Sequence, residues 1–222
     1  MSLLADHPTA EAVLAAMPCY PVPFQGQSPA LEALRAARAG QGLAVGHNGV
    51  MLVLRRPWLQ LDALVTSPMA IYLPYGSVGR PRADLRCGRI PRAHFEKIMD
   101  HFRGALPNEA AAFVFWNEST FAFLVEFPAI DEATPSRLVY RTPTLPSEWH
   151  MVCDIHSHGH GPAYFSATDD LDDALATKIS IVIGRIERPC GPEVASRLCA
   201  NGMFMPLPRS PFSGELHANG LL

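Results

Sequence analysis

The second half of the chain places apolar side chains at helical spacing and then in runs that fit strands. Phe95, Ile98, Met99 and Phe102 lie three or four residues apart, which predicts an amphipathic helix over residues 91–104. The apolar run that follows predicts a buried strand over residues 110–116, and similar runs predict strands over residues 121–127, 137–140, 150–156 and 178–186. A second helix over residues 169–176 and a hairpin around residues 200–202 complete the pattern. This order predicts an α/β (α+β) fold in which helices pack on a mixed sheet.

Residues 1–87 follow a different pattern, which predicts a small α+β module of unknown role. Pro29 at the first position of a helix and Gly40 at its end delimit one helix. The sequence Gly-His-Asn-Gly over residues 46–49 is a strong hairpin signal. The other predicted elements are a helix over residues 10–17 and strands over residues 43–45, 50–54 and 70–73.

The predicted domain organisation is this module over residues 1–87, a second domain over residues 88–210 and a tail over residues 211–222. Near the first boundary, an arginine-rich segment comprises Arg80, Arg82, Arg86, Arg89 and Arg92. Such a run is usually a solvated linker, and the alternative is a docking strip for an acidic partner.

Composition narrows the class of protein. Of the 222 residues, 48% are hydrophobic and 18% are charged, which is enough for a packed core. The net charge of −3 makes nucleic acid an improbable partner. Five cysteines without a C-x-x-C pair give no disulfide framework or zinc ribbon. Because no apolar run approaches the roughly 20 residues of a membrane span, we expect a cytoplasmic protein with no membrane contact.

Two histidines near the end of a predicted strand are candidate metal ligands. His156 and His158 alternate along the strand, so their side chains point to the same face. Ser166 and Asp169 follow at the start of the next predicted helix. Two imidazoles and one carboxylate would leave a tetrahedral zinc ion with an open position, which is typical of a catalytic site. Ser166 and Asp169 also fit a helix cap, and that role is compatible with the first.

The arrangement H-S-H-x7-S-x2-D over residues 156–169 resembles the JAMM signature of the MPN/JAB metalloprotease family. The resemblance implies a cytidine-deaminase-like mixed sheet flanked by helices and one Zn²⁺ per chain, held by His156, His158 and Asp169. It also implies a general base upstream, between a helix and a strand, where Glu109 stands in this chain. Ser166 would donate a hydrogen bond to the oxyanion of the reaction.

Several neighbours of the motif leave alternatives open. Asp170 could replace Asp169 if the helix starts one residue later, and His160 could be a loop residue at the mouth of the site or a weak extra ligand. Asp154 lies on the ligand face and could accept a hydrogen bond from a ligand histidine or form the polar lip of a cleft. The chain departs from the family in having Gly159 where proline often follows the second histidine.

The resemblance implies a zinc-dependent hydrolase of peptide or isopeptide bonds that acts on a ubiquitin-like or sulfur-carrier-like protein. The alternative is a non-catalytic or latent MPN scaffold that binds partner proteins. Together with its N-terminal module, the chain also resembles the protein A family of plasmid-associated PRTRC cassettes. Those cassettes also encode ThiF-related proteins, which makes a ThiF/E1-like protein a second expected partner.

Overall fold

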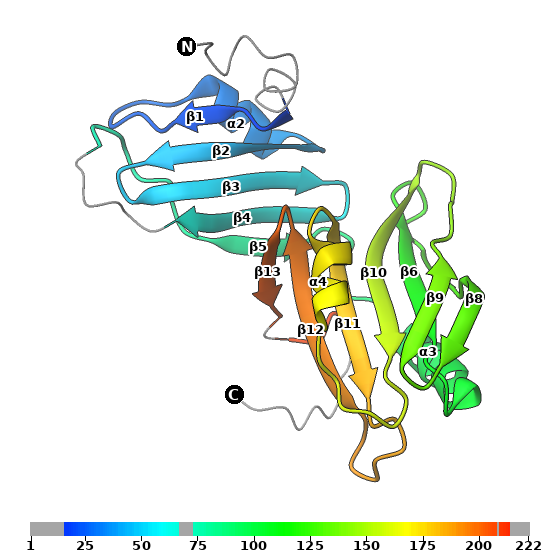
Figure 1. Cartoon of the computed structure of the whole chain (residues 1–222). Coiled ribbons are helices and arrows are strands. Elements are labelled where there is room, and N and C mark those ends of the chain that lie inside the picture. The colour runs from blue at the N-terminus through cyan, green and yellow to red at the C-terminus, as the bar shows by residue number, and fades with distance from the viewer. Residues whose placement is uncertain (1–15, 67–72, 208, 214–222) are drawn as a thin grey trace, which may run out of the picture. The chain divides into compact units, whose positions relative to one another are not determined.

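The computed structural model describes residues 16–66, 73–207 and 209–213 (Figure 1). The chain divides into two compact units, Met1–Arg86 and Cys87–Leu222. The predicted helix over residues 10–17 and the predicted strand over residues 70–73 lie almost wholly outside the described residues.

The N-terminal unit is a five-stranded sheet with one described helix, α2 (Pro29–Ala36). The strands, in both chain and sheet order, are β1 (Cys19–Pro21), β2 (Gly40–Gly46), β3 (Gly49–Arg56), β4 (Leu59–Thr66) and β5 (Arg82–Leu85). Only β1 pairs in parallel, with β2. Leu31 of α2 is buried in one cluster with Ala44, Met51 and Val53 of the sheet. The apolar side of the helix therefore packs on the strands, as its sequence spacing favours.

The hairpin predicted around residues 46–49 is confirmed, because β2 and β3 pair in antiparallel fashion up to Gly46 and Gly49. The linker interpretation of the arginine-rich segment is wrong for residues 82–85, which form the edge strand β5 beside β4. Charged side chains are common on edge strands, since they discourage further pairing.

The C-terminal unit has the predicted mixed α+β class. Its elements are α3 (Arg92–Ala105), β6 (Ala111–Asn117), β7 (Phe123–Glu126), β8 (Ala129–Thr134), β9 (Arg137–Arg141), β10 (Trp149–Ser157), α4 (Ala167–Asp173), β11 (Thr177–Gly184), β12 (Glu193–Ala200) and β13 (Met203–Pro206). The main sheet has the order β13-β12-β11-β10-β6-β7, and β8 pairs only with β9. The strand β8 was not predicted, because its sequence is polar and four of its six residues are exposed.

The order of this sheet decides where the histidine motif lies. β10 and β11 are parallel neighbours, whereas the other pairs of the main sheet are antiparallel. The connection between two parallel strands must cross over the sheet, and here it contains α4 (Figure 1). The crossover therefore carries Ser166 and Asp169 back toward the end of β10, where His156 lies. Ligand sites of open sheets typically form at such carboxyl ends.

The expected tail begins later than residue 211. Phe212 is fully buried, its ring lies 5.2 Å from that of Phe95 in α3, and it forms a bridge with Ile90. Phe95, Ile98, Met99 and Phe102, the predicted apolar face of α3, are all buried. Residues up to 213 thus close over the N-terminal end of α3, and residues 214–222 lie outside the described part of the chain.

Replacing Phe212 with alanine is expected to destabilise the C-terminal unit by about 3–5 kcal/mol, because a fully buried ring leaves a cavity behind. The measurement is the free energy of unfolding in urea. Leu171→Ala is a suitable control, since that side chain is 78% exposed and its loss should change the free energy by at most about 0.5 kcal/mol. Equal effects of the two substitutions would show that residues 211–213 do not belong to the folded unit.

Candidate metal centre

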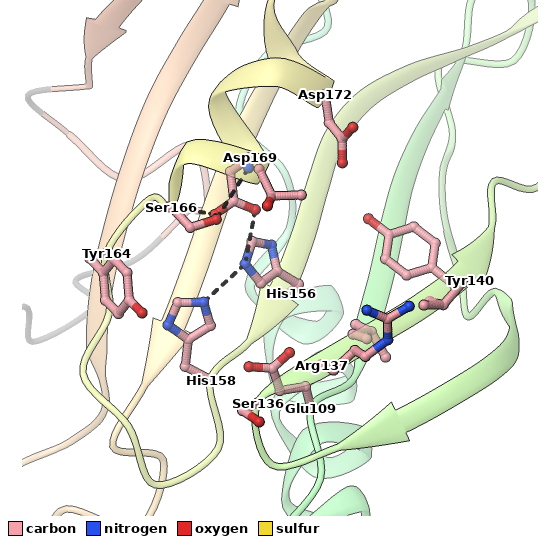
Figure 2. A pocket seen from close by; sticks show the side chains of 13 residues that line it. Glu109, Ser136, Arg137, Tyr140, His156, His158, Tyr164, Ser166, Asp169 and Asp172 are labelled. Carbon is pink, nitrogen blue, oxygen red and sulfur yellow. Dashed lines mark hydrogen bonds and ion pairs between the residues drawn. The ribbon is translucent and has the colours of Figure 1, made fainter.

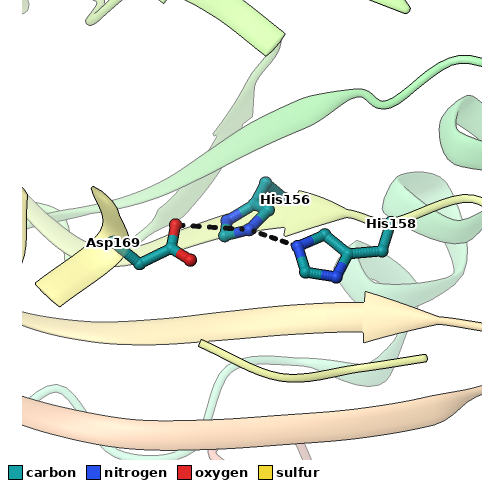
Figure 3. A group of neighbouring side chains, drawn as sticks. All are labelled: His156, His158 and Asp169. Carbon is teal, nitrogen blue, oxygen red and sulfur yellow. Dashed lines mark hydrogen bonds and ion pairs between the residues drawn. The ribbon is translucent and has the colours of Figure 1, made fainter. Parts of the chain in front are cut away.

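The two motif histidines and Asp169 converge on one point (Figures 2 and 3). The Nε2 atoms of His156 and His158 are 3.3 Å apart, and Nε2 of His156 is 3.5 Å from Oδ1 of Asp169. One ligand atom from each of the three residues lies within 4.8 Å of the other two. The spacing predicted from the sequence therefore brings two imidazole nitrogens and one carboxylate oxygen together.

A turn after the strand fixes the orientation of His158. Its Nδ1 lies 2.9 Å from the carbonyl oxygen of Pro162, so Nδ1–H donates a hydrogen bond to that carbonyl. The unprotonated Nε2 then carries the lone pair that can bind a metal. Gly159 follows with a φ of +52°, a value that proline cannot adopt. Proline therefore does not fit this backbone turn, which the hydrogen bond from Gly161 N–H to His158 O closes.

The two oxygens of Asp169 have separate roles. Oδ2 accepts hydrogen bonds from the backbone N–H and the hydroxyl of Ser166, at 2.6 and 2.7 Å. The Ser166 hydroxyl accepts in turn from Asp169 N–H, which completes a capping box at the start of α4. Oδ1 is left to face His156. Capping and metal binding are therefore compatible, and the Ser166 hydroxyl proton is used to hold Asp169.

Glu109 lies across the cleft from the histidines, in the connection between α3 and β6 (Figure 2). Its backbone N–H donates to Thr134 O of β8, which ties this connection to the β8–β9 hairpin. Partial burial raises the pKa of the carboxyl, while the positive charge that His158 can carry opposes the rise. A carboxyl with a raised pKa holds a proton more readily, which suits a group that both accepts and returns a proton.

Ser157, the middle residue of the histidine motif, joins the two sides of the site. It is fully buried, its N–H donates to Ala110 O, and its hydroxyl accepts from Ala110 N–H at 3.0 Å. Ala110 follows Glu109, so this pair of bonds fixes Glu109 relative to His156 and His158. The sequence marked Ser157 only as a letter of the motif, because its partner lies 47 residues away.

Ser157→Ala is expected to lower the stability of the C-terminal unit by about 1–3 kcal/mol, because Ala110 N–H would be buried without an acceptor. Urea unfolding measures the change. Ser119→Ala, at an exposed turn position, should leave the free energy of unfolding nearly unchanged. A neutral Ser157→Ala would mean that the Glu109 connection is held by other contacts.

A cleft of about 430 Å³ opens in front of the three converging residues. Besides the site residues, it is lined by side chains that the sequence did not single out: Ser136, Arg137, Leu138, Val139, Tyr140, Tyr164, Thr168 and Asp172. Tyr140 packs edge to face on Phe113, with ring centroids 5.6 Å apart. The β8–β9 hairpin therefore forms one wall of the cleft, a placement that strand periodicity alone does not reveal.

The structure places three further candidates away from the converging atoms. His160 is exposed and lies 3.6 Å from a carboxylate oxygen of Glu187. Asp170 accepts a hydrogen bond from Arg197 at 2.5 Å, and α4 starts so that Asp169 and not Asp170 faces the histidines. Asp154 is mostly buried, so the predicted polar lip is wrong, and its Oδ2 lies 2.5 Å from Lys178 Nζ. The alternative, in which Asp154 accepts from a ligand histidine, is replaced by this ion pair.

The chemistry of these donors fits a zinc ion. Burial lowers the pKa of His156, with the Asp169 charge opposing, so the imidazole is held in the neutral form that binds metals. Asp169 keeps one oxygen free, and the cleft offers an open side for a further ligand. Two nitrogens, one oxygen and an open position form the donor set of catalytic zinc sites.

Two family models match the chain, one in each unit. Residues 91–198 match the family described as prokaryotic homologs of the JAB domain, and the C-terminal unit is therefore a JAB/MPN domain. Residues 7–86 match a domain of unknown function, DUF2016. The pairing of the two domains fits the resemblance to the PRTRC cassette family.

Two solved structures are similar to part of the chain. Protein DSY2949 from Desulfitobacterium hafniense is 20% identical, over 56% of this chain and 94% of that protein, with a TM-score of 0.42. AF2198, a JAB1/MPN domain protein from Archaeoglobus fulgidus, is 15% identical over 54% and 94%, with a TM-score of 0.34. No curated protein matches the chain significantly. Within the described residues, no helix is both long and apolar enough to span a membrane.

Proposed function

We propose that the C-terminal unit is a zinc-dependent hydrolase of peptide or isopeptide bonds. The observation that carries the proposal is the convergence of His156, His158 and Asp169 on one point, with Glu109 across the same cleft. JAB/MPN domains include metal-dependent isopeptidases, which agrees with this reading.

The residues of the site would have different roles in such a reaction. His156, His158 and Asp169 would hold the metal, which when bound makes water a better nucleophile near neutral pH and polarises the scissile carbonyl. Glu109 takes a proton from the attacking water and returns it to the departing amine. In the free site, the Ser166 hydroxyl donates to Asp169 Oδ2. During the reaction this hydroxyl would turn and donate instead to the oxygen that becomes negatively charged, while the Ser166 backbone N–H keeps its bond to Asp169.

For the substrate we propose a ubiquitin-like or sulfur-carrier-like protein, and for a second partner a ThiF/E1-like protein. Both follow from the resemblance to JAMM enzymes and PRTRC proteins. The cleft supports a protein substrate because it is open on one side and is walled by a hairpin, where an extended chain can approach.

The alternative is a scaffold or a latent enzyme. Zinc binding measured together with activity distinguishes this alternative from an active hydrolase. The full chain, purified without added metal and without a histidine tag, would be analysed for zinc and then incubated with diubiquitin and a fluorogenic ubiquitin conjugate. About one zinc per chain, with cleavage that a chelator stops, supports the hydrolase. Zinc without cleavage, even when a ThiF-related protein is added, favours the scaffold. A chain that binds no zinc would overturn the proposal.

A further inference from the structure

The helix that carries Asp169 makes almost no apolar contact with the sheet. Of the seven residues of α4, only Asp173 is buried. Leu171 within the helix is 78% exposed, and Leu175 just after it is 92% exposed. A helix this short does not form by itself in water, and in most proteins an apolar face holds such a helix in place. The position of α4 must therefore depend on polar contacts.

The face of the sheet beneath α4 carries charges that could provide these contacts. Asp154 of β10 pairs laterally with Ser180 of β11, and Ser180 pairs with Arg197 of β12. Lateral partners point to the same face of a sheet. His156 and Lys178 are each two residues from a member of this row, so they share that face as well. A candidate metal ligand, the buried Arg197 and the mostly buried Lys178 thus lie on one surface below the helix.

Arg197 forms hydrogen bonds with two residues of α4. Its guanidinium donates to Asp170 at 2.5 Å and to Asp173 at 2.7 and 3.1 Å. The same group lies between the rings of Phe165 and Phe204, at 3.9 and 4.0 Å from their centroids. Phe165 directly precedes Ser166, the cap of the helix. One side chain therefore contacts the segment on both sides of Asp169.

Lys178 holds the same helix from the neighbouring strand. Its Nζ lies 2.8 Å from Oδ1 of Asp173 and 2.5 Å from Oδ2 of Asp154. Asp173 consequently uses one oxygen for Lys178 and the other for Arg197. Burial would raise the pKa of Asp173, but the hydrogen bonds from Lys178 and Arg197 outweigh it and leave the pKa below its usual value. The contact therefore persists as an ion pair across the neutral range.

We propose that Arg197 and Lys178 are positioning residues that hold α4 by charge, so that Asp169 Oδ1 faces His156 and His158. Asp169 and Asp173 are four residues apart and lie on the same face of the helix. Anchoring Asp173 and Asp170 therefore fixes the direction of Asp169. The inference rests on the proposed function, since it requires that the three residues bind zinc.

The test is the zinc affinity of Arg197→Lys in the full chain, measured by competition with a chromophoric chelator. Lysine keeps the charge, but its single nitrogen cannot reproduce the contacts that Nε, Nη1 and Nη2 of the guanidinium make to Asp170 and Asp173. It also cannot stack on the two rings as the planar guanidinium does. We expect zinc to bind about 10–100-fold more weakly, the usual cost of removing a group that orients a metal ligand. The visible spectrum of the cobalt-substituted protein should change as well, because the carboxylate ligand moves.

Two further variants separate positioning from general stability. Phe212→Ala, distant in sequence and packed on α3, should lower the melting temperature without weakening zinc binding. Asp170→Asn breaks a single contact at a half-exposed side chain, so it should fold normally and weaken zinc binding less than Arg197→Lys does.

The outcomes distinguish this inference from the proposed function. Wild-type affinity in both Arg197→Lys and Asp170→Asn, with a lowered melting temperature alone, would overturn the positioning role and leave the zinc site intact. Absence of zinc binding by the wild-type chain would overturn the proposed function and the inference together.

Discussion

Replacing Glu109 with glutamine is expected to leave zinc bound and to lower the rate of hydrolysis by about 10²–10⁴-fold, the usual contribution of a general base. Glutamine has nearly the same shape, so the cleft and the backbone bond to Thr134 should persist. The amide, however, cannot take a proton from water. The measurement is the turnover of the fluorogenic ubiquitin conjugate, or of a cognate substrate once one is found, alongside the zinc content.

Glu187→Gln provides the matched control, because Glu187 is an exposed glutamate in the same unit and lies outside the cleft. It should retain both zinc and activity. If Glu109→Gln turned over substrate at the wild-type rate, the base would have to be another group. Loss of zinc from Glu109→Gln would instead indicate that Glu109 supports the metal site itself.

Replacing His158 with alanine is expected to abolish stoichiometric zinc binding. The substitution removes one of only two nitrogen donors and leaves His156 and Asp169, which cannot enclose the ion. The loss of affinity should exceed the about 10–100-fold that follows removal of an outer partner of a ligand. Elemental analysis of protein prepared without added metal measures the zinc content.

His160→Ala is the control for this experiment, since His160 lies two residues further along the same segment but is exposed and faces Glu187. Its zinc content should equal that of the wild type. Full zinc occupancy in His158→Ala would place the ion at other residues and remove the basis of the proposed hydrolase.

The ligand residues could be predicted from the sequence because they depend on local geometry. Alternation along one strand places His156 and His158 on one face, and a capping pattern places Asp169 in the first turn of the next helix. Glu109 could be placed only through the resemblance to JAMM enzymes, since a strand pairing joins its neighbour Ala110 to residue 157.

The contacts that support the ligands could not be predicted in this way. Asp154 and Lys178 are 24 residues apart, and nothing in their sequence indicates that two parallel strands bring them together. The same holds for Arg197, which lies 24 residues after Asp173 in the chain. The predicted tail over residues 211–222 includes Phe212, and only the packing on Phe95 reveals the role of this residue.

Ala110 and Ser157, which pair in the folded unit, are both synthesised before several other residues of the site. A nascent chain that ends at Ser157 already contains Glu109 and β10. It lacks Asp169 and also Arg197, which binds two acidic residues of α4. Because β12 follows about 40 residues later in the chain, at translation rates of about 5–20 residues per second several seconds pass before the site can close. The proposed metal site is therefore incomplete until nearly the whole C-terminal unit has emerged.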